Sequence, residues 1–158
     1  MKQYCDGGEA ILEDSISFRA YKAVGGLFVT AAEANYAYGG DVYPDGVEPL
    51  CCLRAKALSS QPVASELWFI AWAQHPSATS PPIVTARLFG FDGEMFRIRW
   101  TTDPFFSMYT DKAVQVTANG GFTLRTMPDP REVTVINKQY AVTADGPQKV
   151  TEWETQER

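Results

Sequence analysis

The residues best suited to binding chemistry lie in a tyrosine-rich stretch between Glu33 and Pro49. Tyrosine offers a flat apolar ring and a hydroxyl group at low entropic cost. Sugar-binding sites combine such a stacking ring with the polar groups of Asp and Asn, and this stretch supplies both. We therefore predict a ligand-binding loop here; the same residues also fit a loop that folds back to cap a barrel end. The candidate ligand-binding residues are Asn35, Tyr36, Tyr38, Asp41 and Tyr43.

Catalytic chemistry has little support in the sequence. A Ser-His or Cys-His nucleophile would need His75, the single histidine, which precedes Pro76 in a stretch typical of an exposed loop. One histidine and no Cys-x-x-Cys spacing predict no metal site, and no phosphate-binding glycine loop is present. Carboxylates occur singly in turn-like stretches, and no spacing selects the pair that a glycosidase needs. We expect no cofactor, and the sequence assigns no catalytic residue.

Two further groups of residues are candidates for contact with a partner. Residues 105–109 are apolar for a connection, which predicts either a barrel plug or a partner-binding patch. Arg97 and Arg99 alternate along a predicted strand with Phe96, Ile98 and Trp100, so the arginines should face one side and the apolar residues the other. The two arginines are then either solvated or paired with an acidic ligand.

Composition limits the class of protein. The chain has 158 residues, of which 45% are hydrophobic and 13% aromatic, which predicts a single β domain over 1–158 with a sufficient core. Fourteen basic residues against nineteen acidic ones give a net charge of -5, which argues against binding to nucleic acid. The longest apolar stretch is too short to span a bilayer, so no membrane span is expected.

The N-terminal residues and the cysteines bear on the compartment. No apolar run follows Lys2, so no secretory signal is expected, and a signal removed earlier would leave no trace here. The cysteine count is odd, and the vicinal Cys51 and Cys52 would point to opposite faces of a strand. Reduced thiols and a cytoplasmic location are therefore expected.

Short β-strand patterns flank turn residues along most of the chain. Alternating apolar and polar residues on both sides of glycine- or asparagine-containing turns predict hairpins. The fourth of these turns would be Asn137-Lys138, and residues 148–153 predict a last strand. The paired segments are 16–21 with 27–31, 83–89 with 95–100, 113–118 with 122–127, and 132–136 with 139–144.

Two apolar segments, 50–58 and 66–72, are ambiguous between helix and strand. The spacing from Ala64 onward also fits one helix, but the β pattern on both sides favours two strands. About ten to twelve closely spaced strands then predict an all-β fold, a closed antiparallel barrel. The alternative is an up-and-down barrel with one short helix.

Part of the chain resembles one unit of a fascin-like β-trefoil. The resemblance rests on an apolar strand at 16–20, a glycine turn into an aromatic-Val-Thr-Ala strand at 26–31, a third strand at 53–55 and an acidic-aromatic strand at 66–70. Residues 137–146 resemble the same second-strand turn. The match covers about a third of the chain. It implies a β-trefoil as the preferred form of the barrel, with loops that bind sugars, proteins or proteases.

These observations predict a non-enzymatic binding module that recognises a carbohydrate, as lectins do, or a protein through its surface loops. Its oligomeric state is not predicted. The alternative is a small β-barrel enzyme of the cyclase or isomerase type with an apolar cavity. The interior distinguishes them, because a trefoil is filled by large side chains whereas a barrel enzyme keeps a pocket of several hundred Å³.

Overall fold

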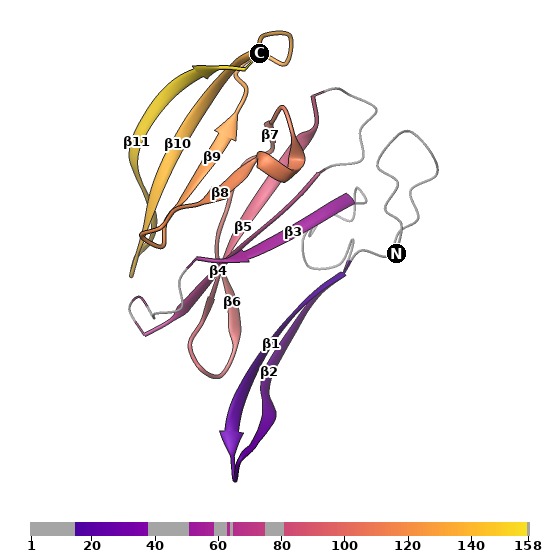
Figure 1. Ribbon diagram of the computed structural model, residues 1–158, viewed down its shortest axis with the longest axis vertical. Helices are drawn as coiled ribbons and strands as arrows, with labels where there is room; N and C mark the ends of the chain where they lie inside the picture. The colour runs from indigo at the N-terminus through magenta and orange to yellow at the C-terminus, as the bar shows by residue number, and fades with distance from the viewer. Residues whose placement is uncertain (1–14, 38–50, 59–62, 64, 75–80, 158) are drawn as a thin grey trace.

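The computed structural model describes residues 15–37, 51–58, 63, 65–74 and 81–157; at 15–18, 20, 22, 31–37 and 51–53 it describes the backbone alone. These residues form eleven β-strands and one short 3-10 helix, η1 (Thr110–Lys112). The strands make three open sheets of two, four and five strands (Figure 1). The all-β prediction is confirmed. The predicted closed barrel, as a trefoil or as an up-and-down barrel, is wrong because no sheet formed by the described strands closes on itself.

The N-terminal hairpin forms a sheet of its own. β1 (Ser15–Val24) pairs with β2 (Leu27–Ala37), as predicted. Gly25 and Gly26 at the turn both have positive φ, 58° and 82°, which glycine adopts without strain. β2 is longer than expected, so the predicted loop over 33–49 is wrong for residues 33–37. In Figure 1 the hairpin projects away from the other strands at the lower end of the molecule.

A five-stranded sheet follows, in the order β3-β4-β5-β6, with β7 paired to β5 as well. The two ambiguous segments of the sequence are β3 and β4, so the preference for two strands is confirmed. They do not share a sheet with β1 and β2, although the trefoil resemblance joined all four in one unit. The bounds are β3 (Cys51–Ala57), β4 (Leu67–Gln74), β5 (Ile83–Phe91), β6 (Phe96–Thr101) and β7 (Phe105–Phe106).

The four-stranded sheet has the order β11-β10-β9-β8. The predicted hairpin of β8 and β9 and the predicted last strand are confirmed. The sheet leaves β11 at one edge, bonded to β10 alone among the described strands. The bounds are β8 (Val114–Val116), β9 (Phe122–Thr126), β10 (Thr134–Thr143) and β11 (Gly146–Gln156).

The turn predicted at Asn137-Lys138 is wrong, because β10 runs through both residues. The chain turns instead just before Gly146, whose φ is 107°. Asn137 accounts for the difference: its buried side chain donates hydrogen bonds to the carbonyl of Trp153 at 3.4 Å and to Oγ1 of Thr155 at 3.0 Å. A buried amide needs such partners, and they are supplied only when β11 lies alongside.

The two larger sheets share one apolar core. Ile70 and Trp72 of β4 and Leu88 of β5 belong to the same buried cluster as Phe122 and Leu124 of β9. This is sandwich packing, in which the facing sides of two sheets form the core and the sheet edges stay open; β4 and β5 also bury Ala71 and Phe89 in a second, smaller cluster. Alternation of apolar residues is the same in a sandwich and in a barrel, so the sequence pattern did not distinguish them.

Aromatic rings extend this core where β6, β9 and β10 meet. Phe122 stacks on Tyr140 with ring centroids 5.1 Å apart, and Trp100 lies 5.7 Å and 5.5 Å from the two rings. Burial raises the pKa of the Tyr140 hydroxyl, because the charged phenolate would lose water. The space between the sheets is thus filled by large side chains.

A β-bulge in β6 changes which side chains face the core. Leu88 is opposite Trp100 and Phe89 is opposite Ile98, which leaves Arg99 as the extra residue. Trp100 therefore packs into the core between the sheets, while Ile98 lies on the other face with Phe89. The prediction that all apolar residues of this strand share a face is wrong, because strict alternation does not continue through a bulge.

Candidate functional site

The structure describes only part of the predicted tyrosine-rich site. Asn35 and Tyr36 lie in β2, where their backbones pair with β1. Tyr38, Asp41 and Tyr43 lie outside the described residues. The carbohydrate-binding site therefore stays a prediction, and its two described members belong to a strand rather than to a loop.

The described ranges contain no grouping typical of a metal centre. Within them, no three His, Cys, Asp or Glu side chains come together to hold an ion. His75 and Cys5 lie outside the described residues, while Cys51 and Cys52 are part of β3. No helix in the same ranges is long and apolar enough to cross a bilayer.

Arg97 is paired with a carboxylate of its own hairpin. Its Nη1 lies 2.6 Å from Oδ2 of Asp92. Asp92 also accepts hydrogen bonds at 2.9 Å from the backbone N–H groups of Met95 and Glu94, and these bonds lower the pKa of its carboxyl group. The Asp92 carboxylate therefore stabilises the turn between β5 and β6.

Arg99 is held by an acidic residue far away in the chain. Its Nε donates to Oε2 of Glu66 at 3.0 Å, and its Nη2 contacts the other carboxylate oxygen. Glu66 is buried, and its carboxylate packs against the backbone of Gly90. A Cβ atom at position 90 would be only 3.0 Å from the Glu66 Cδ and 3.2 Å from the Arg99 Nε. The bidentate pair is a structural link from β6 to the residue before β4. No local pattern indicates it, because 33 positions separate the two residues.

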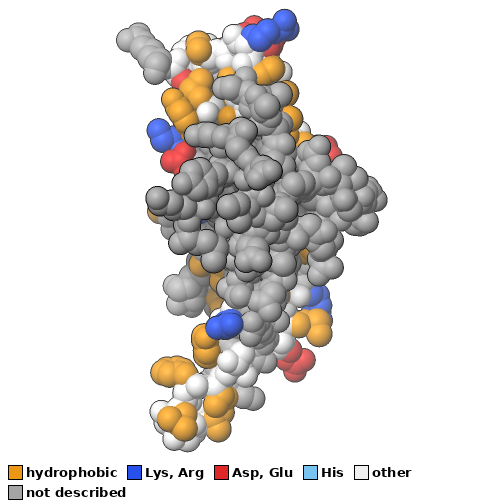
Figure 2. Space-filling view, turned by 90° about the vertical axis from the view of Figure 1, so that its right-hand side faces the viewer, with side chains coloured by type: hydrophobic (Ala, Val, Ile, Leu, Met, Phe, Trp, Pro, Cys, Tyr) orange, Lys and Arg blue, Asp and Glu red, His pale blue; other side chains and the backbone are white. Residues whose placement is uncertain are grey.

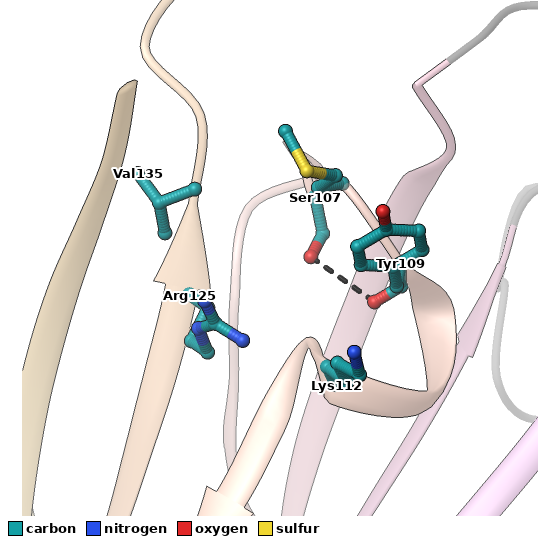
Figure 3. A pocket seen from close by; sticks show the side chains of 6 residues that line it. Ser107, Tyr109, Lys112, Arg125 and Val135 are labelled. Carbon is teal, nitrogen blue, oxygen red and sulfur yellow. Dashed lines mark hydrogen bonds between the residues drawn. The ribbon is translucent and has the colours of Figure 1, made fainter. Parts of the chain in front are cut away.

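A small pocket lies beside residues 105–109 (Figure 3). The space open to water-sized molecules is about 10 Å³, enough for about one water and far below the roughly 300–1,000 Å³ of ligand sites. Residues 105–109 contain β7 and form one wall of this pocket. The interpretation of these residues as a barrel plug is wrong, because the described strands form no barrel. The lining residues are Ser107, Met108, Tyr109, Lys112, Arg125 and Val135.

The polar groups of this pocket are already engaged. The Ser107 hydroxyl donates to the carbonyl of Tyr109 at 3.3 Å, and the Lys112 ammonium lies 4.7 Å from the Tyr109 ring centroid. Arg125 forms an ion pair with Glu157. The pocket is therefore a packing feature of the sandwich rather than a substrate site.

The outer end of the β1–β2 hairpin is the strongest candidate for a binding surface. Leu27 and Phe28 next to the turn are 70% and 80% exposed, and Val24 and Tyr21 are more than half exposed. Figure 2 shows hydrophobic side chains gathered at this lower tip of the molecule. Exposed apolar groups concentrated on one projection mark sites of interaction.

Both faces of the hairpin carry these side chains. The register pairs Val24 with Leu27, and Ala23 with Phe28. Because adjacent positions of a strand point to opposite faces, Leu27 lies on one face and Phe28 on the other. A two-stranded ribbon has no second layer of its own to cover either face. The continuous apolar run at 27–29 was the sequence signal for this surface, but such a run ordinarily indicates a buried strand.

The hairpin is also chemically distinct from the rest of the chain. The hairpin, residues 15–37, has Arg19, Lys22 and Glu33 as its charged residues, and its outer part, residues 20–32, contains no Asp, Glu, Asn or Gln. The net charge of the hairpin is +1, so the remainder of the chain, at -5 minus +1, carries -6. The hairpin is an apolar, cationic projection on an acidic protein.

The described architecture is that of an all-β protein with two packed open sheets and a projecting hairpin. Comparison with protein-family models, with curated proteins and with solved structures finds no match to this chain. Function is therefore inferred from the exposed hairpin itself.

Proposed function

We propose that this chain is a non-enzymatic binding module that holds a protein partner through the outer end of its β1–β2 hairpin. The observation that carries the proposal is the exposure of Leu27 and Phe28 at the tip of a projecting ribbon. The sequence predicted protein binding through surface loops as one of two ligand classes. The contact surface proposed now is a hairpin rather than the tyrosine-rich loop.

Burial of the exposed ring and aliphatic side chains of the hairpin would make binding to a partner thermodynamically favourable. A phenylalanine side chain offers about 200 Å² of apolar surface. Covering the exposed part of Phe28 would then contribute roughly 4 kcal/mol at about 25 cal/mol per Å². Leu27 adds a contribution of the same kind. A few residues buried at the centre of an interface carry most of its binding free energy, and the exposed ring of Phe28 is the candidate for that role here.

A protein fits the hairpin better than a sugar or a bilayer does. Sugar recognition uses carboxylate and amide side chains, and residues 20–32 at the outer end of the hairpin have neither. A bilayer core would leave the backbone groups at both open edges of a two-stranded ribbon without partners. A protein surface can cover the apolar side chains and also bond to those edges.

The enzyme alternative has less support than the binding module. It required a closed barrel around an apolar cavity. The sheets are open, and Trp72, Leu88 and Phe122 fill the space between the two larger ones.

Site-specific photo-crosslinking tests the proposal. A benzoylphenylalanine is introduced in place of Phe28 in the full chain, and, as a matched control, in place of Met95, an exposed apolar residue of the β5–β6 turn. In an extract of the cells that make the protein, irradiation should give a discrete polypeptide adduct from position 28 and none from position 95. Adding Leu27→Asp to the chain that carries benzoylphenylalanine at position 28 should remove most of the adduct.

Two results would contradict the proposal. One is an absence of adducts at position 28 above the level at position 95. The other is an undiminished adduct when Leu27→Asp is added, which would show that the apolar tip is not the contact. Circular dichroism and urea unfolding of the Leu27→Asp chain check its fold, and its stability should change by less than about 0.5 kcal/mol because the position is exposed.

A further inference from the structure

We infer that the protein partner of the hairpin is a second copy of this chain, and that the hairpin adds as extra strands to the open edge of β11. This inference rests on the proposed function and names the partner. The two surfaces are different, so the contact is head-to-tail.

β11 is an unusually open sheet edge. It is eleven residues long, against about five or six for a typical strand, and every residue from Gln148 to Gln156 is exposed. Such an edge presents a row of backbone N–H and C=O groups to any strand that can pair with it. Proteins protect edges with proline, lysine or a β-bulge; here Pro147, Lys149 and the bulged Val150 all lie in the first half of the strand, and residues 151–156 pair regularly with β10. Val150 and Trp153 are 63% and 43% exposed.

The charges of the two surfaces are complementary. β11 contains one lysine and two glutamates, a net charge of -1, against +1 for the β1–β2 hairpin over 15–37. Glu152 is exposed and is paired with Lys149 at 3.0 Å, while Glu154 is exposed and forms no ion pair with any described residue. An acidic edge with exposed apolar side chains suits a cationic ribbon with exposed apolar side chains.

The position of the hairpin favours contact between copies. In Figure 1 β11 lies in the upper half of the molecule, and the hairpin points away from it at the lower end. Within one copy the two surfaces therefore do not meet. Among the described strands, β1 and β2 pair only with each other, so both edges of the hairpin are open to a neighbouring strand. Each copy then offers one hairpin and one edge, which generates a ring or a linear array.

Light scattering after size exclusion tests the inference on the full chain. The wild-type mass should rise from 17.5 kDa in multiples of that value as concentration is raised from about 5 to about 500 μM. Leu27→Asp/Phe28→Asp, which removes the apolar tip, and Glu152→Lys/Glu154→Lys, which reverses the edge charge, should each weaken association at least about tenfold. Glu94→Lys/Asp111→Lys makes the same charge change at exposed positions outside β11 and should associate like the wild type.

Mixing the two defective variants gives the sharper result. Leu27→Asp/Phe28→Asp retains an intact β11 edge, and Glu152→Lys/Glu154→Lys retains an intact hairpin tip. The mixture should therefore form a dimer of twice 17.5 kDa and no larger species, because the other tip and the other edge are defective. A mixture that stays monomeric would overturn the head-to-tail contact.

A monomeric wild type at every concentration would overturn the inference. If position 28 then crosslinks to a different polypeptide, the proposed function stands and only the identity of the partner is wrong. Monomers that bind vesicles of phosphatidylcholine and phosphatidylserine, and lose that binding in Leu27→Asp/Phe28→Asp, would instead assign the tip to a membrane surface and overturn both.

Discussion

Substituting Gly90 by alanine tests whether the ion pair of Glu66 and Arg99 stabilises the sandwich. Gly90 lies on β5 directly under the Glu66 carboxylate, and a Cβ atom there would be 3.0 Å from the Glu66 Cδ and 3.2 Å from the Arg99 Nε. These distances leave no room for a methyl group while the bidentate pair is in place. Gly90→Ala should therefore displace the carboxylate and separate the two charges.

The expected loss follows from the burial of the pair. Leaving a buried charge without its partner costs about 3–5 kcal/mol. The Arg99 side chain is 35% exposed, so water partly replaces the carboxylate and lowers this cost. Alanine also restricts the unfolded chain, which contributes about 0.4–1 kcal/mol in the opposite direction. We expect the free energy of unfolding to fall by roughly 2 kcal/mol.

Urea unfolding followed by tryptophan fluorescence measures this change, as a decrease of about 1 M in the midpoint. A double-mutant cycle with Glu66→Ala isolates its cause, because alanine at position 66 has no carboxylate for the new methyl group to displace. In that background Gly90→Ala should cost less than about 0.5 kcal/mol. Strict additivity of the two substitutions, or a single-variant loss below about 0.5 kcal/mol, would refute the reasoning.

Three further predictions concern the sandwich and its turns. Gly121→Ala should lower the free energy of unfolding by about 2 kcal/mol in the same urea assay, because the added methyl group would meet the backbone carbonyl of Tyr140. Burial raises the Tyr140 pKa above 10.0, so the wild-type protein should lose stability as the pH rises from 10.0 through the raised value. Tyr140→Phe has no hydroxyl to ionise and should lack this loss when urea midpoints are compared at about pH 8 and about pH 11. Hydrogen bonds from the N–H groups of Met95 and Glu94 lower the Asp92 pKa below 3.8, so the stability that the Asp92 carboxylate contributes should be present above pH 3.8 and be lost as the pH falls through the lowered value. Asp92→Asn should remove this part of the pH dependence of the urea midpoint, measured between about pH 6 and about pH 2.

The local elements could be predicted because their signals lie within a few residues of one another. The hairpin turn at Gly25-Gly26 needs positive φ at both positions, and only glycine adopts it freely. The same reasoning found the hairpins of β5 with β6 and of β8 with β9. It failed at Asn137, where an asparagine typical of turns is buried in a strand by partners on β11.

The candidate site was less predictable than the elements that carry it. The sequence indicated a hairpin at 16–31 but not that its end would remain uncovered, since Leu27, Phe28 and Val29 in succession are typical of a buried strand. The pairing of Arg99 with Glu66 was equally hidden, because it depends on a bulge and on a contact across the sheet.

The amino-acid sequence by itself determined the strands and most of their turns, because alternation and turn chemistry act between neighbouring residues. The tertiary structure alone decided that the sheets stay open, that Trp100 faces inward and that Phe28 faces water. These outcomes depend on which strand edges meet, and a period-two pattern carries no information about pairing between distant strands.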